Sequence, residues 1–161
     1  MSEVICNTSP LQYLHQLGLL RLLPAIARRV TVPTAVVAEL EIGRAAGLDL
    51  PDPATLDWVD IRSPAKLAGL LPIELGPGEA EVLALARESA DAELLLDDLA
   101  ARHAAEKLGF RVRGTLGVLL DAKRAGFIPT VAPVLDQLQA LGFRLHAKTR
   151  AEILQRAGET P

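Results

Sequence analysis

Two short apolar segments of this sequence end in polar side chains whose types suit metal chemistry. The segment VIC is followed by Asn7, Thr8 and Ser9, and the segment ELLL by Asp97 and Asp98. Mg²⁺ and Mn²⁺ prefer oxygen ligands and keep several bound waters, so such groups can form a cation site. The same residue types are ordinary helix caps, and capping is the alternative role for each group.

Three glutamates are further candidates. Glu79 and Glu81 lie in GPGEAEVLALA, in the first turns of a predicted helix, where a carboxylate also complements the helix dipole. The Gly-Pro-Gly before them permits close backbone approach. Glu39, in VVAELE, borders the apolar face of another predicted helix, whereas Glu41 is more solvated. A surface role is the alternative for Glu39.

Other site chemistries lack their motifs. The three histidines stand alone without HExxH spacing, Cys6 is the only cysteine, and no GxSxG elbow is present. The GTLG segment at 114–117 is neither GxGxxG nor a P-loop, although its amides can meet one phosphate.

The elements that must position these groups follow from the alternation of short β-branched runs with helical patterns, which predicts βα units and a parallel sheet. We expect strands over Val4–Cys6, Val30–Val32, Trp58–Ile61, Glu93–Leu96 and Phe110–Val112. We expect a first helix that the NTSP tetrapeptide opens and that runs up to Gly18, and further helices over residues 19–27, 34–46, 77–89, 99–108, 115–125, 130–141 and 149–157. A single helical turn is expected at 65–70, and a loop at 48–57. Parallel strands deliver their carboxyl ends to one edge, so neighbouring strands would bring the polar groups into one crevice.

The composition predicts a core of aliphatic side chains. The 161 residues match a single domain over 1–161, with 50% hydrophobic and only 3% aromatic residues, which disfavours binding by stacked aromatics. The start of the chain has no basic segment followed by a long apolar run, and no stretch is long enough to span a membrane. We therefore expect a cytoplasmic protein without membrane contact.

Charge is unevenly distributed along the chain. Residues 1–101 carry 7 Lys and Arg against 15 Asp and Glu, whereas residues 102–161 carry 10 against 5. An acidic first part and a basic second part suit a metal-assisted enzyme that acts on a polyanion. A chance distribution of solvated charges is the alternative.

Five segments in order resemble PIN-domain proteins, most closely the branch called DUF3368. They are NTSPL after a strand, the VPxxVxxEL pattern from Val32, GPGEAEVLALA, LLLDDLAAR and GTLGVLLDAK, and they cover about residues 4–128. The resemblance implies a PIN-like three-layer α/β/α fold with a short, mostly parallel central sheet. It also implies a Mg²⁺- or Mn²⁺-dependent ribonuclease, and many such proteins are toxins of toxin–antitoxin pairs.

The resemblance also assigns the acidic positions of the family. They fall on Asn7 with the hydroxyl of Thr8 or Ser9, on Glu39, on Glu79 or Glu81, and on Asp97 or Asp98. Active PIN nucleases usually have Asp at the first position. An amide oxygen can ligate a cation but adds no negative charge, so Asn7 predicts weaker metal binding.

RNA hydrolysis is thus the predicted activity. The candidate nucleic-acid contacts are Thr8, Ser9, Arg102 and Lys123, of which Arg102 and Lys123 could meet phosphates. A structural ion pair is the alternative for Arg102. A small antitoxin and a second copy of the chain are expected partners. The main alternative is a PIN-like binding module weakened by Asn7, and a third is a receiver-like phosphoacceptor, suggested by the Asp pair and Lys123.

Overall fold

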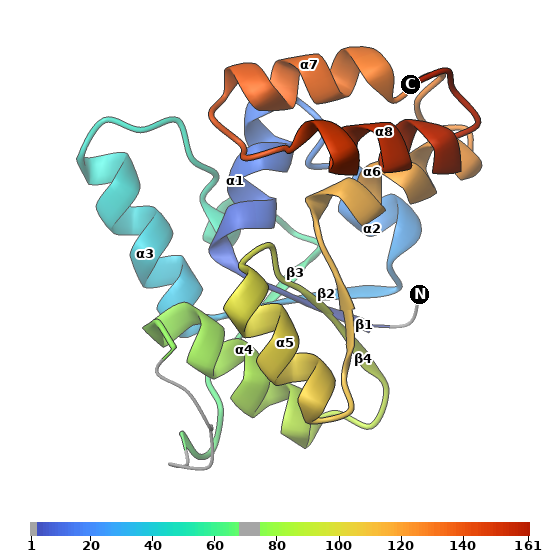
Figure 1. The fold of residues 1–161 in the computed structure, drawn as a ribbon. Helices are drawn as coiled ribbons and strands as arrows, with labels where there is room; N and C mark the ends of the chain where they lie inside the picture. Colours follow the sequence, from blue (N-terminus) through green and yellow to red (C-terminus); the bar gives the residue numbers. More distant parts are fainter. Residues whose placement is uncertain (1–2, 68–74) are drawn as a thin grey trace.

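The computed structural model describes residues 3–67 and 75–161, and at its centre is a five-stranded sheet (Figure 1). Its strands are β1 (Glu3–Cys6), β2 (Arg29–Pro33), β3 (Val59–Arg62), β4 (Ala92–Leu95) and β5 (Arg111–Arg113). They lie in the order β3-β2-β1-β4-β5, and all neighbours are parallel. The predicted α/β class and the short parallel sheet are confirmed, and each strand lies within one residue of its predicted bounds.

Eight α-helices of the described residues cover the two faces of the sheet (Figure 1). They are α1 (Thr8–Gln16), α2 (Leu22–Ile26), α3 (Thr34–Ala45), α4 (Pro77–Glu88), α5 (Leu99–Lys107), α6 (Thr115–Arg124), α7 (Ala132–Ala140) and α8 (Ala147–Arg156). Apolar residues of α4 and α5 pack on one face, and those of the other helices belong to the cluster on the opposite face. None of the helices in 3–67 and 75–161 combines the length and apolarity of a membrane span.

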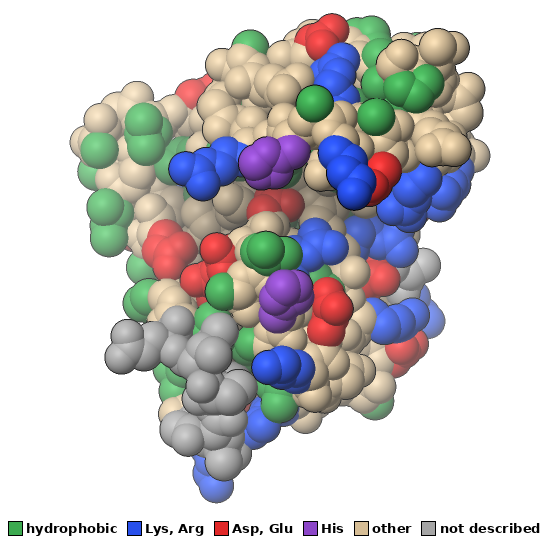
Figure 2. Space-filling model, viewed as in Figure 1, with side chains coloured by type: hydrophobic (Ala, Val, Ile, Leu, Met, Phe, Trp, Pro, Cys, Tyr) green, Lys and Arg blue, Asp and Glu red, His purple; other side chains and the backbone are tan. Residues whose placement is uncertain are grey.

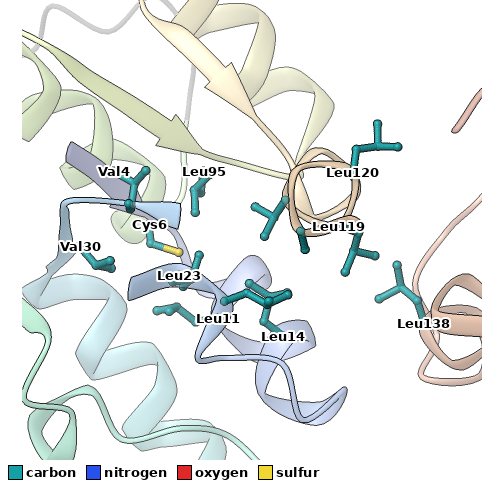
Figure 3. Packing of buried hydrophobic residues seen from close by; sticks show 14 of the residues in the cluster. Val4, Cys6, Leu11, Leu14, Leu23, Val30, Leu95, Leu119, Leu120 and Leu138 are labelled. Carbon is teal, nitrogen blue, oxygen red and sulfur yellow. The ribbon is translucent and has the colours of Figure 1, made fainter. Parts of the chain in front are cut away.

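Strand alternation divides the core into these two clusters. In β1, Val4 and Cys6 point to the larger cluster, which also contains Leu14 of α1 and Leu119 of α6 (Figure 3). Ile5, between them, belongs to the cluster under α4 and α5. The central strands are therefore buried on both faces, as expected where helices cover both sides of a parallel sheet.

Some predicted bounds differ from the structure. The expected loop at 48–57 contains a 3₁₀ turn at Pro53–Thr55, because the Asp52 side chain accepts a hydrogen bond from the Ala54 amide, 3.1 Å away. The last helix begins at Ala147, two residues before the predicted start. The helical turn expected at 65–70 lies partly outside the described residues, and residues 65–67 are not helical.

A contact that we call the C-terminal clasp ties α8 to α6 and α7. The Lys123 ammonium donates to the Ala157 carbonyl at 2.6 Å and to the Glu159 carboxylate at 2.8 Å. The same carboxylate accepts the Val131 and Ala132 amides, at 2.7 and 3.0 Å, and so caps the start of α7. The clasp thereby fixes the place of α8 against the rest of the protein.

Candidate functional site

The carboxyl ends of β1 and β4 lie side by side at the centre of the sheet. Cys6 pairs with Leu95, and the Asn7 amide donates to the Leu95 carbonyl at 3.1 Å. The chain order of the strands reverses between β1 and β4, and ligands of open parallel sheets bind at such a point. The two polar groups predicted to share one edge therefore do so, with Asn7 after β1 and Asp97 after β4.

Asn7 does not act as a helix cap. It occupies the N-cap position of α1 in an extended conformation, but its side chain makes no capping hydrogen bond. The residue is only 7% exposed, and its Oδ1 is buried with no hydrogen-bond partner among the described residues. A buried oxygen without a hydrogen-bond partner lowers the stability of the folded protein. We therefore expect this atom to bind a ligand from outside the chain.

Glu39 of α3 meets Asn7 over the first turn of α4. The Thr8 hydroxyl donates to Oε2 of Glu39 at 2.5 Å, and the Gly78 amide donates to Oε1 at 3.0 Å. A methyl group at Gly78 would lie 2.9 and 3.0 Å from the two Glu39 oxygens and 3.0 Å from Oδ1 of Asn7. The Glu39 carboxylate and the Asn7 amide oxygen therefore converge beside Gly78, where a larger residue would have to displace them.

The two glutamates of α4 have different places. Glu81 is buried, and its Oε1 accepts the Thr34 hydroxyl at 3.0 Å and the Ala35 amide at 2.8 Å, so it caps α3. Glu79 accepts the Gly76 amide at 3.2 Å. Burial raises the pKa of Glu79, the Gly76 hydrogen bond opposes this, and the charges of Asp98 and Glu39 add to the increase. Glu79 therefore shares the electrostatic field of the site, whereas Glu81 is engaged in capping α3.

The two aspartates after β4 also differ. Asp98 caps α5 by accepting the Ala101 amide at 2.9 Å. Asp97 accepts both the amide and the hydroxyl of Thr115, each at 2.7 Å, and so joins the end of β4 to the start of α6. Burial raises the pKa of Asp97, while the two Thr115 hydrogen bonds and the positive charge of Arg102 oppose the increase.

Thr115 has a role that the sequence analysis did not assign. The GTLG segment suggested amides for a phosphate, but the Thr115 amide is used by Asp97. Asp97 and Thr115 are 18 residues apart, and no sequence pattern predicts a contact between them.

The candidate phosphate contacts lie in different surroundings. Arg102 is half-buried and donates weakly to the Leu96 carbonyl at 3.4 Å. A methyl group at Gly114 would lie 2.5 Å from Nη1 of Arg102 and 3.0 Å from Oδ1 of Asp97, so these two groups approach the same point. Lys123 belongs to the C-terminal clasp, which favours a structural role for it. Ser9 is half-buried in α1.

The carboxylates do not form a compact metal cage. Within the part of the chain that the structure describes, no three His, Cys, Asp or Glu side chains come close enough to hold one ion. Asn7 and Glu39 are the pair that converges. Mg²⁺ is commonly held by one or two protein carboxylates and several waters, so a pair of oxygen donors is compatible with this ion.

A hollow beside the site separates α4 and α5 from α7 and α8. Acidic side chains lie to the left of this hollow, and Lys and Arg side chains gather to its right (Figure 2). A cavity of about 500 Å³ is lined by residues of α5, β5, α6 and α8, with Asp97 and Arg102 in its wall. The acidic site therefore opens toward the basic part of the molecule.

A comparison with protein families identifies the family of this chain. A family model described as a PIN domain, DUF3368, matches residues 3–159. No curated protein is detectably similar to the chain. PIN domains have a nuclease-type fold, generally use divalent metal ions and are associated with nucleic-acid binding. With the parallel sheet and with the polar groups at the ends of β1 and β4, this match shows that the chain belongs to the DUF3368 family of PIN domains.

Proposed function

We propose that this protein is a Mg²⁺- or Mn²⁺-dependent ribonuclease whose cation is held by Asn7 and Glu39. The observation that carries the proposal is the buried Oδ1 of Asn7, which has no partner among the described residues and converges with the Glu39 carboxylate over Gly78. Amide and carboxylate oxygens are hard donors, and Asn7 and Glu39 supply one of each beside Gly78.

Each neighbouring residue has a role in this proposal. Thr8 and the Gly78 amide hold the Glu39 carboxylate in place. A divalent cation, when bound, activates a water molecule and offsets the charge that builds on the phosphate. Glu79, whose pKa is raised, is the residue we propose to accept and return a proton through its second oxygen, Oε2. Asp97 and Asp98 complete the negative field that attracts the cation.

RNA is the substrate we propose, because the acidic site opens toward a basic second part of the chain. A toxin that acts in the cytoplasm, held inactive by a small antitoxin and able to form a homodimer, is the biological role that the family resemblance favours. A weakened PIN-like binding module is the second candidate. The observation that favours it is the neutral amide at Asn7 together with the lack of a three-carboxylate cage among the described residues.

Thermal denaturation with Mn²⁺ tests the metal site. A ligand that binds only the folded protein adds about 2.7 kcal/mol of stability at a hundredfold excess over its Kd. We expect Mn²⁺ to raise the Tm of the wild type, and Glu39→Gln to lose most of this increase. Glu41→Gln is the matched control, because Glu41 is exposed on the same helix and should leave the increase unchanged.

Cleavage of a labelled single-stranded RNA should follow the same pattern. We expect Mn²⁺-dependent cleavage by the wild type and by Glu41→Gln, and none by Glu39→Gln or in EDTA. A wild-type Tm that millimolar Mn²⁺ leaves unchanged would contradict the metal site, and binding of RNA without cleavage would favour the binding module.

A further inference from the structure

The 500 Å³ cavity borders the acidic site at Asp97 and extends away from it. Asp97 and Arg102 line the cavity, and both side chains approach the point beside Gly114. The other walls come from β5, α6 and α8, which carry none of the proposed cation ligands. A molecule that enters the cavity would therefore lie next to the acidic site without occupying it.

The charges that line the cavity are only partly neutralised. Four arginines and three carboxylates form its charged lining. Arg113 and Arg124 both pair with Asp121. Arg156, in contrast, forms no ion pair with any carboxylate of the described residues. Arg102 lies near Asp97 and its charge acts on that carboxylate, but the two do not form a close ion pair. A guanidinium group that faces a cavity without a carboxylate partner is suited to bind a phosphate.

Apart from Thr149, the uncharged part of the lining consists of apolar side chains and glycines. Leu99 is 66% exposed directly after Asp98, and Leu116 and Ile153 lie in the same lining. A volume of about 500 Å³ lies within the range of small-molecule sites, which combine apolar walls with a few polar anchors. The base of a nucleotide can pack against the apolar side chains, and its phosphate can bind the arginines. An acidic peptide helix needs a long groove instead.

We propose that this cavity holds one nucleotide of a single-stranded RNA beside the phosphate to be cleaved. The base lies against Leu99 and Ile153, and the phosphate lies between Arg102 and Arg156. This inference rests on the proposed ribonuclease function and adds the position of the substrate. The C-terminal clasp supports it, because Lys123 holds the carbonyl of Ala157, the residue after Arg156.

Equilibrium binding in EDTA tests the cavity without catalysis. Fluorescence anisotropy of a labelled single-stranded oligoribonucleotide gives the Kd over a range of salt concentrations. We expect Arg156→Gln to weaken binding and to lower the salt dependence by about 0.7 in log K per log salt, the share of one phosphate contact on a single strand. Arg87→Gln is the matched control, since Arg87 is also exposed in the last turn of a helix but does not line the cavity. It should bind like the wild type.

A second variant should act in the opposite direction. Glu152 is exposed one turn before Arg156 and lines the cavity, so its negative charge opposes a phosphate. We expect Glu152→Gln to tighten RNA binding. Glu106→Gln, an exposed change outside the cavity, should not.

The outcomes separate this inference from the nuclease proposal. Wild-type RNA affinity in both Arg156→Gln and Glu152→Gln would overturn the cavity as a nucleotide site, whatever Mn²⁺ does to the Tm. Binding of a polyglutamate peptide that depends on Arg156 and that RNA does not compete with would also overturn it. RNA binding that depends on Arg156, in a protein that Mn²⁺ does not stabilise, would support the cavity and overturn the ribonuclease.

Discussion

At the residue scale, Asn7 determines how the site behaves without a cation. Its amide oxygen is buried beside the Glu39 carboxylate, where a second carboxylate would meet a like charge in a place shielded from water. The neutral amide avoids this repulsion but attracts a cation less strongly. Asn7 and Glu39 can therefore stay close together when no cation is bound.

Asn7→Asp should change stability and metal binding in opposite directions. We expect the metal-free variant to lose on the order of 1–3 kcal/mol, the cost of an uncompensated buried polar or charged group, and therefore to melt at a lower temperature. Mn²⁺ should then raise its Tm by more than it raises that of the wild type. Melting curves in EDTA and in Mn²⁺ measure both effects. Asn7→Ala is the reference, because it removes the oxygen without adding charge, and weaker Mn²⁺ binding in Asn7→Asp would show that Asn7 faces away from the ion.

The sequence predicted that Asn7 and Asp97 would follow strand ends at one edge of the sheet, but it did not predict the partners of the other carboxylates. Two strand ends with polar residues suffice to predict a shared edge, provided that the strands are neighbours. The capping of α3 by Glu81 depends on how α3 packs against α4, across 46 residues of chain to the Ala35 amide. Local patterns contain no information on such a contact, so Glu79 and Glu81 could not be distinguished from the sequence.

At the element scale, the C-terminal clasp should make the stability of α7 and α8 depend on pH. Hydrogen bonding from Lys123 is the main cause that lowers the pKa of Glu159, and the Val131 and Ala132 amides contribute. A carboxyl group whose pKa is lower in the folded state stabilises the protein above its unfolded pKa. That stability is lost as the pH falls through the folded value.

Glu159→Gln should therefore cost about 1 kcal/mol near neutral pH, the usual value of a helix cap, and progressively less as the solution becomes acidic. Urea denaturation of the wild type and of the variant between neutral and acidic pH measures the difference. Glu106→Gln, an exposed change elsewhere, should follow the wild type at every pH. A difference that does not depend on pH would mean that the Glu159 charge contributes nothing to the clasp.

The elements themselves were more predictable than their contacts. Strand bounds were accurate to a residue because the β-branched and apolar runs are short and have turn or capping residues close by, such as Asn7, Pro64, Asp97 and Gly114. The role of Lys123 was not predictable, since its partner lies 36 residues further along the chain. Its positive charge made it a candidate phosphate contact, whereas the fold gives it a carboxylate and a carbonyl.

At the scale of the whole molecule, the acidic and basic parts of the chain meet at one hollow. The acidic side chains of α3, α4 and the end of β4 lie on one side of it, and α8 brings arginine to the other (Figure 2). The acidic first part and the basic second part of the sequence therefore lie on opposite sides of the same hollow. This distribution of charge would attract a polyanion to the basic side of the hollow and a cation to the acidic side.

The sheet order also leaves β3 and β5 as edge strands, and this has a consequence for solubility. Unpaired edges invite a strand of another molecule, and charged side chains discourage such pairing. In β3, the exposed Ile61 is flanked by Asp60 and Arg62, which pair with Arg29 and with Glu3 and Glu88. Replacing Asp60 and Arg62 with Val should leave the monomer folded by circular dichroism but increase light scattering on warming. The same two positions changed to Thr should scatter less, because the edge stays polar, and equal scattering would show that the charges do not protect this edge.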